Sequence, residues 1–139
     1  MRTLALLLSL LLPLSLLAQD VPTRYAKAKV QDVVSDADRY QGKTIAVYGQ
    51  MISAVAESNV VTSAGCDEDP SRERASISIE ILPDKADYSD QELSAGLKKF
   101  EYLHEFDKKC VWVVGEFYKG GENKGASIGV LRKVEFIYK

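Results

Sequence analysis

The sequence predicts a mainly β domain of five short strands, with one long helix between the third and fourth strands and a short helix before the first. Three observations predict it. Apolar and polar residues alternate over several short stretches, as they do in half-buried strands. One stretch instead repeats its apolar residues at helical spacing, behind an N-terminal capping signal. About 120 residues follow an apolar leader, enough for one domain with one core.

The first 18 residues are typical of a secretory signal peptide. Arg2 precedes a leucine-rich run over residues 4–17, and Ala18 offers a small residue for cleavage. This run is shorter than the roughly 20 apolar residues that a membrane-spanning helix needs, although an uncleaved anchor is the alternative. We therefore expect one mature domain over residues 19–139, exported to the periplasm, with no stable membrane insertion after signal cleavage.

The charge balance argues against one class of partner. The chain carries 18 basic and 20 acidic residues, for a formal net charge of −2. Proteins that bind nucleic acid usually present a basic stripe to the phosphates. No nucleic-acid partner is therefore expected.

The N-terminal part of the mature chain is predicted to contain little regular structure. Residues 25–34 fit either a short helix or an extended lead strand. Ser35 then has the character of an N-cap, followed by acidic residues in a first helical turn. Gly42 should end this short helix.

The first three strands are predicted over residues 44–52, 60–62 and 75–82. A turn at residues 57–59 separates the first two strands, and residues 63–74 form a polar loop before the third. Strict alternation defines the inward-facing residues. In the first strand they are Ile45, Val47, Gly49 and Met51, and in the third Ile77, Ile79 and Ile81.

A helix of about four turns follows Pro83. Ser89 and Glu92 form the S-x-x-E pattern of a capping box, in which each residue bonds the backbone amide of the other. The apolar residues that follow recur at helical spacing and are expected to face the core. They are Leu93, Leu97, Phe100 and His104, with Leu103 widening the stripe.

Two further strands end the chain. They are predicted over residues 111–118 and 127–138, joined by a glycine-rich hairpin loop over residues 119–125. The alternation slips around residues 131–133, which indicates a bulge.

This order of elements is that of the OB-fold, a five-stranded Greek-key barrel. Gly49 and Gly115 lie in the middle of the first and fourth strands, where a strand that coils around a small barrel needs a residue without Cβ. The stretches 40–49, YQGKTIAVYG, and 111–117, VWVVGEF, resemble short exported bacterial OB-fold proteins, which commonly carry Y-x-G-K-x-[VI]-x-V-x-G and V-x-V-x-G-x-F. The resemblance implies the fold and is nearly silent on function.

Cys66 and Cys110 both follow the leader, so a disulfide between them is the first interpretation for an exported chain. Two buried thiols or a metal site are the alternatives, but His104 is the only histidine and no CxxC motif is present. The expected barrel raises a geometric question. Its second strand should end at the opposite rim from the start of the fourth, whereas a disulfide needs Cα atoms about 4.4–6.8 Å apart.

The sequence offers no catalytic set, so the chain is not expected to be an enzyme. His104 has no nucleophile motif nearby. The acidic cluster at residues 67–69 lacks the spaced ligands of a calcium loop, which favours a solvated loop over a cation site. Neither a metal nor a cofactor is expected.

The candidate interaction surface consists of Tyr48, Arg72, Arg74, Trp112 and Tyr118. Tyr48 and Trp112 meet if the first and fourth strands pair, and they are then either exposed or, more often for such a pair, covered by an N-terminal helix within residues 25–40. The usual OB ligand side, outside the second and third strands, offers only Ser76, Ser78 and Glu80.

Two functions fit these expectations. The first is a non-catalytic OB-fold binding module that engages a protein or a small ligand in the periplasm. The alternative is an immunity-type inhibitor that neutralises a periplasm-acting toxin, through a charged and complementary surface.

Overall fold

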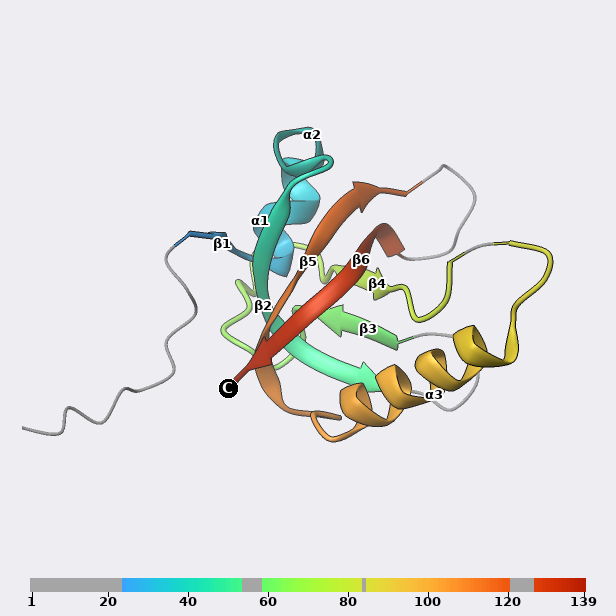
Figure 1. Ribbon diagram of the computed structural model, residues 1–139. Coiled ribbons are helices and arrows are strands. Elements are labelled where there is room, and N and C mark those ends of the chain that lie inside the picture. Colours follow the sequence, from blue (N-terminus) through green and yellow to red (C-terminus); the bar gives the residue numbers. More distant parts are fainter. Residues whose placement is uncertain (1–23, 54–58, 84, 121–126) are drawn as a thin grey trace, which may run out of the picture.

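The computed structural model describes residues 24–53, 59–83, 85–120 and 127–139. Within them the chain is mainly β, as predicted (Figure 1). The predicted leader and parts of two predicted turns, residues 57–58 and 121–125, lie outside the described residues. Of the described helices, none is long and apolar enough to cross a membrane. The elements are β1 (Ala26–Lys29), α1 (Val30–Ser35), α2 (Ala37–Tyr40), β2 (Thr44–Ser53), β3 (Asn59–Thr62), β4 (Ser76–Ile79), α3 (Asp90–His104), β5 (Cys110–Lys119) and β6 (Ser127–Tyr138).

The strands form one sheet whose pairings return to their starting point. The order is β1-β2-β3-β4-β6-β5, and β5 also pairs with β2, so β2 to β6 make a closed circuit. Most pairings are antiparallel, but β4 and β6 run parallel. β1 is a further short strand, parallel to β2, with Ala26 opposite Ile45. Residues 25–34, which fit either a strand or a helix by sequence, form both in succession.

β2 changes neighbours near its middle. β5 lies along one edge from Thr44 to Gln50. On the other edge β1 lies beside the first half, and β3 begins to pair at Gln50. A Cβ at Gly49 would lie 2.5 Å from the carbonyl oxygen of Thr62 and 2.8 Å from a methyl carbon of Val30. Only glycine fits this close approach, so the predicted need for Gly49 is confirmed.

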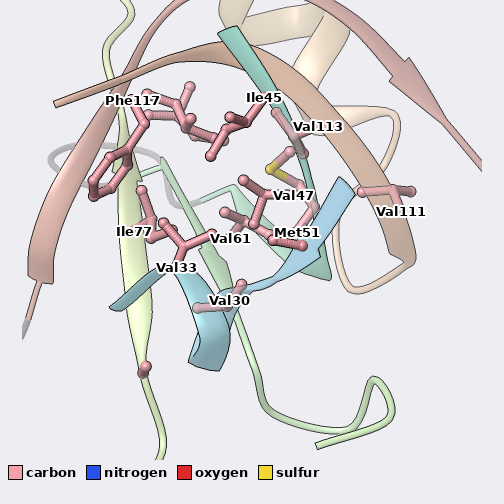
Figure 2. Close-up of a cluster of buried hydrophobic side chains, with 14 of the residues drawn as sticks. Val30, Val33, Ile45, Val47, Met51, Val61, Ile77, Val111, Val113 and Phe117 are labelled. Carbon is pink, nitrogen blue, oxygen red and sulfur yellow. The ribbon is translucent and has the colours of Figure 1, made fainter. Parts of the chain in front are cut away.

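The main core lies inside the circuit of strands (Figure 2). The predicted inward residues of β2 are buried there, together with the alternate residues of β5. Val30 and Val33 of α1 fill the same core, so the first helix closes one side of it. Burying side chains of this size contributes roughly 1.5–3 kcal/mol each. The largest fully buried residues are Phe117, Ile45, Met51, Ile77, Leu103, Leu131, Val30, Val33, Val47, Val61, Val111 and Val113.

The helix boundaries before β2 differ from the prediction. Ser35 ends α1, where its hydroxyl donates to the carbonyl of Asp32 at 3.1 Å, and Asp36 is the N-cap of α2. The apolar residues Val30 and Val33 start the helical region earlier than the polar capping signal indicates, because their burial in the core outweighs local capping preference.

α3 begins with the predicted capping box. The Ser89 hydroxyl accepts from the Glu92 amide, and the Glu92 carboxylate accepts from the Ser89 amide. The helix lies at the end of the sheet away from α2 (Figure 1). Its buried residues are Gly96 and Leu103, while Leu93 and Leu97 are 47% and 59% exposed. The expectation that the leucines of this helix face the core is therefore right for Leu103 and wrong for Leu93 and Leu97.

Two differences concern the later strands. β4 ends at Ile79, three residues before the predicted end, although Ile81 still packs partly against the core. The bulge predicted around residues 131–133 is present in β6. The pairing with β5 shifts between Val114 and Glu116, and Lys133 has a φ of 49°.

Candidate binding surfaces

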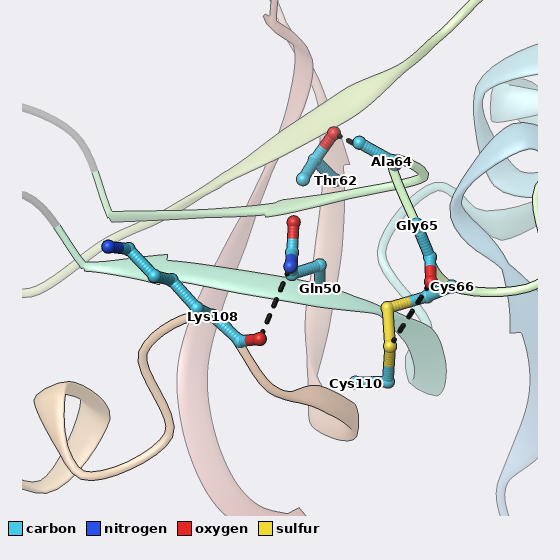
Figure 3. The surroundings of a disulfide bond; sticks show 7 residues. All are labelled: Gln50, Thr62, Ala64, Gly65, Cys66, Lys108 and Cys110. Atoms are coloured by element: carbon cyan, nitrogen blue, oxygen red, sulfur yellow. Dashed lines mark hydrogen bonds between the residues drawn. A yellow bond between two sulfur atoms is a disulfide. The ribbon is translucent and has the colours of Figure 1, made fainter.

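Cys66 and Cys110 form the predicted disulfide (Figure 3). Their Cα atoms are 5.6 Å apart, within the range that this bond allows. The sulfur of Cys110 also lies 3.6 Å from the carbonyl oxygen of Gly65. The bridge joins the polar loop over residues 63–74, hereafter the Cys66 loop, to the first residue of β5.

The geometric objection to this bridge is wrong, because β3 and β5 use different halves of β2. β3 ends with Thr62 opposite Gln50, and β5 begins with Cys110 opposite the same residue. The end of β3 and the start of β5 therefore flank Gln50 on its two sides, instead of lying at opposite rims. The short step from Thr62 to Cys66 then suffices to reach across β2 (Figure 3).

Gln31 attaches the Cys66 loop to α1. Its side chain is buried, and the amide nitrogen donates to the carbonyls of Asp69 and Glu73 at 3.2 and 3.1 Å. The amide oxygen accepts from the backbone N–H of Asp69 at 2.9 Å. One buried side chain thus bonds three backbone groups of the loop. The Asp69 carbonyl also accepts from the backbone N–H of Arg72 at 3.1 Å.

Arg72 strengthens the same attachment from the loop side. Its guanidinium bonds the carboxylate of Asp32 at 2.8 Å, the carbonyl of Gln31 at 2.6 Å and the hydroxyl of Ser35 at 3.1 Å. These bonds of its two terminal nitrogens give Arg72 a structural role in the fold.

The acidic cluster of the Cys66 loop is divided among separate partners. Asp67 pairs with Lys29 at 2.6 Å, and Glu68 pairs with Arg74 at 3.2 Å. Asp69 accepts from the amide and the hydroxyl of Ser71, and the hydroxyl bond lowers the pKa of this carboxyl. Among the described residues no group of acids, histidines and cysteines is arranged to hold a metal ion.

Tyr48 and Trp112 meet on the outer side of the sheet. They lie opposite each other on β2 and β5, with ring centroids 5.0 Å apart. Beside them Ala46 and Val114 form a small second core, which Tyr25, Trp112 and Tyr138 cover. We call Tyr25, Tyr48, Trp112 and Tyr138 the aromatic face. The Lys27 ammonium lies 5.8 Å from the Trp112 ring centroid.

The expected cover for this pair is absent from the described N-terminal helices. α1 points Val30 and Val33 into the main core, on the other side of the sheet. Tyr25, just before β1, is the residue of this segment that packs beside Trp112 in the second core. The rings of Tyr48 and Trp112 consequently remain partly exposed.

Tyr118 is engaged within the sheet. Its hydroxyl donates to the Glu116 carboxylate at 2.8 Å, a bond that lowers the pKa of Glu116 and raises that of Tyr118. Lys133 bonds the same carboxylate at 3.2 Å, and the Arg132 guanidinium lies 4.8 Å from the Tyr118 ring centroid. The five predicted surface residues therefore do not converge, and only Tyr48 and Trp112 form a pair.

A second surface on α3 was missed by the sequence reasoning. Leu93, Leu97, Phe100 and His104, hereafter the α3 stripe, follow one another at helical spacing but lie beside the buried side of the helix. Gly96 carried the missed signal. A glycine inside a helix destabilises it by roughly 0.5–1 kcal/mol unless close packing requires it, and a Cβ at Gly96 would lie 2.7 Å from Leu82.

His104 is an exposed member of that stripe. Its ring stacks on Phe100, with centroids 5.9 Å apart and planes inclined by 22°. This contact gives His104 a packing role.

Comparison with known proteins adds no family to this geometry. The chain matches no protein-family model, and a search of curated proteins finds no match.

Proposed function

We propose that this chain is an exported, non-catalytic binding module with an OB-fold, which engages a protein or a small ligand in the periplasm through its aromatic face. The observation that carries the proposal is the Tyr48–Trp112 pair, which lies outside the main core and is partly exposed. Tyr and Trp supply large apolar contact area with a polar tip, and they dominate the energetics of many binding sites.

The strand order supports the OB-fold part of the proposal. Apart from β1, the strands pair in the order β2, β3, β4, β6, β5 and back to β2. Along the chain, α3 lies between β4 and β5, the third and fourth of these five strands. The disulfide supports export, because such bonds persist in oxidising compartments. The leucine-rich leader supports the periplasm as the destination.

The polar outer side of β4 supports the exclusion of nucleic acid. Ser76 and Ser78 are half-buried, and Glu80 pairs with Arg132 at 3.0 Å. A site for single-stranded nucleic acid would place aromatic and basic side chains on such a strand.

Capture from periplasmic extract tests the proposal. The bait is the oxidised chain over residues 19–139, compared with Tyr48→Ser and with Tyr88→Ser as a matched control. Tyr88 bonds the Pro83 carbonyl in the segment before α3, away from β2 and β5. A protein or small molecule held by the wild type and by Tyr88→Ser but lost from Tyr48→Ser supports the aromatic face. Equal retention by Tyr48→Ser contradicts it.

The second candidate is a dedicated inhibitor of a periplasm-acting toxin. The attachment of the Cys66 loop by the disulfide, Gln31 and Arg72 favours it, because a preorganised charged surface loses little entropy on binding. The same capture experiment separates the two functions. One tightly held partner at equal stoichiometry indicates an inhibitor, whereas several weak ligands indicate a general module.

A further inference from the structure

Within the part of the chain that the structure describes, the α3 stripe is an apolar surface without a cover. Leu93 and Leu97 are 47% and 59% exposed and lie one helical turn apart. Phe100 and His104 continue the row with their rings stacked. Scattered apolar residues are ordinary on a surface, but a contiguous row of this kind commonly marks an interaction site.

The fold does not need this stripe to hold α3 in place. Leu103 is fully buried, and Gly96 lets the helix approach Leu82 closely. The hydroxyl of Tyr102 accepts from the backbone N–H of Ile137 at 3.3 Å, which ties the helix to β6. Lys99 packs half-buried on the sheet side, where burial lowers its pKa. The attachment of α3 therefore lies beside the stripe, and the stripe itself remains available.

The charges beside the stripe indicate what would cover it. Asp90, Glu101 and Glu105 lie along one side of the row, by their positions on the helix, and all three are exposed. In the described part of the chain none of these carboxylates has an ion-pair partner within 4.0 Å. Two bases lie near them: Lys98 by its position on the helix, and Lys109, whose ammonium donates to the backbone carbonyl of Glu105 at 3.0 Å. An apolar row with an acidic border complements a segment that carries apolar and basic residues.

A second copy of this chain fits the same surface poorly. Packing two α3 stripes against each other would gather six carboxylates around one apolar seam, with four ammoniums, those of Lys98 and Lys109 in each copy, to offset them. Like charges brought together at an interface are destabilising. A partner with lysine or arginine flanking its apolar residues avoids this repulsion.

We propose that the α3 stripe docks an amphipathic segment of another protein, with its apolar residues on Leu93, Leu97 and Phe100 and its basic residues beside Asp90, Glu101 and Glu105. This interaction goes beyond the proposed ligand site, because the stripe lies on α3 and the aromatic face lies on β2, β5, the end of β6 and the residue before β1. The failure of either proposal leaves the other intact.

Two synthetic 14-residue peptides test the proposal by fluorescence anisotropy with the oxidised chain over residues 19–139. One has leucine at helical spacing (i, i+3, i+4, i+7) and lysine at most other positions, to form a basic amphipathic helix, and the other has glutamate in place of each lysine. The basic peptide should bind and the acidic one should not. Leu93→Ser with Leu97→Ser should weaken binding by about tenfold or more, since the lost apolar contact is what the stripe supplies.

A pair of charge-reversal variants separates local recognition from general attraction. Glu101→Lys with Glu105→Lys should weaken binding by roughly fivefold or more. Asp36→Lys with Glu73→Lys makes the same change in net charge at exposed acids away from α3 and should have little effect. Circular dichroism confirms that each variant remains folded, which we expect because all substituted side chains are exposed.

Several results would overturn the proposal. Equal loss of binding in both charge-reversal variants would show that the peptide is attracted by the net charge of the protein and not by the acids beside the stripe. Dimerisation of the wild type in sedimentation, abolished by Leu93→Ser with Leu97→Ser, would make a second copy the occupant. Binding to phosphatidylcholine vesicles that requires the same leucines would make the surface a membrane contact. No binding of the basic peptide at millimolar concentration would remove the site.

Discussion

The Cys66 loop and α3 show opposite relations between composition and attachment. The loop is polar and acidic, yet a disulfide, a buried glutamine and an arginine fix it to β5 and α1. α3 has the apolar spacing of a packed helix, yet it leaves Leu93 and Leu97 exposed. The comparison teaches that the number of apolar residues in a segment does not by itself predict how that segment is attached to the fold. A few specific bonds attach the polar loop, whereas part of the apolar stripe remains exposed.

Removing the disulfide should have the largest effect on this comparison. Replacing both Cys66 and Cys110 by serine should lower the free energy of unfolding by about 3–4 kcal/mol in the chain-entropy account, since the bridge spans a sequence separation of 44. Urea unfolding of residues 19–139 measures it. A change below about 1 kcal/mol would show that Gln31 and Arg72 fix the loop without the bridge.

A pair of identical substitutions sharpens the α3 side of the comparison. Leu103→Ala removes a fully buried side chain and should destabilise the fold by about 2–5 kcal/mol. Leu97→Ala, on the same helix but 59% exposed, should change stability by less than about 0.5 kcal/mol. Thermal and urea unfolding of the two variants provide the measurement, and similar losses would mean that the stripe packs against the fold after all.

Gln31 tests whether hydrogen bonds hold the loop. Gln31→Ala removes the side-chain partner of the Glu73 carbonyl and of the Asp69 N–H, while the Asp69 carbonyl keeps its bond from the Arg72 N–H. The substitution should cost about 1–3 kcal/mol. Gln31→Glu keeps the acceptor for the Asp69 amide but turns a carboxylate oxygen toward two carbonyls, so it should be at least as destabilising. Amide hydrogen exchange at Asp69 reports the local effect, and unchanged protection in both variants would contradict it.

The smallest expected effect is a pH dependence at the start of α3. Bonds from Lys85 and from the Ser89 amide hold the pKa of Glu92 at about 2, below its usual 4.5. A carboxyl with a depressed pKa contributes its stabilisation above the ordinary value and loses it as the pH falls, here between about 4.5 and 2. NMR titration of the Glu92 side chain checks this value. Lys85→Ala should raise the pKa, and an unchanged titration would refute the role of Lys85.

Much of the sheet could be predicted from the sequence, because alternation and glycine placement are local signals. The strand from Thr44 and the bulge near Lys133 follow from them. The contact of Tyr48 with Trp112 was expected only if the first and fourth strands pair, which they do. The bridge between Cys66 and Cys110 followed from the compartment, although the expected strand geometry argued against it.

The surfaces could not be predicted in the same way, because they depend on which side of an element meets the sheet. The spacing of Leu93 and Leu97 is that of a buried stripe, but the helix packs through Gly96 and Leu103, which leaves the two leucines exposed. Arg72 looked available for a ligand, but its partners Asp32 and Ser35 come from a segment about 40 residues away in the sequence. Contacts between residues so far apart in the sequence produce no periodic pattern in the sequence.

The position of Gln50 between β3 and β5 has a consequence for the order of folding. Thr62 and Cys110 lie beside each other across Gln50 only when β2 has paired with both neighbouring strands. A chain that has formed only one of these pairings still holds its two thiols apart, so oxidation should follow assembly of the sheet. Thiol trapping during refolding measures this order. Capture of the disulfide before the strands have paired would contradict it. We therefore expect strand pairing to direct folding, and the disulfide to stabilise the sheet after it has formed.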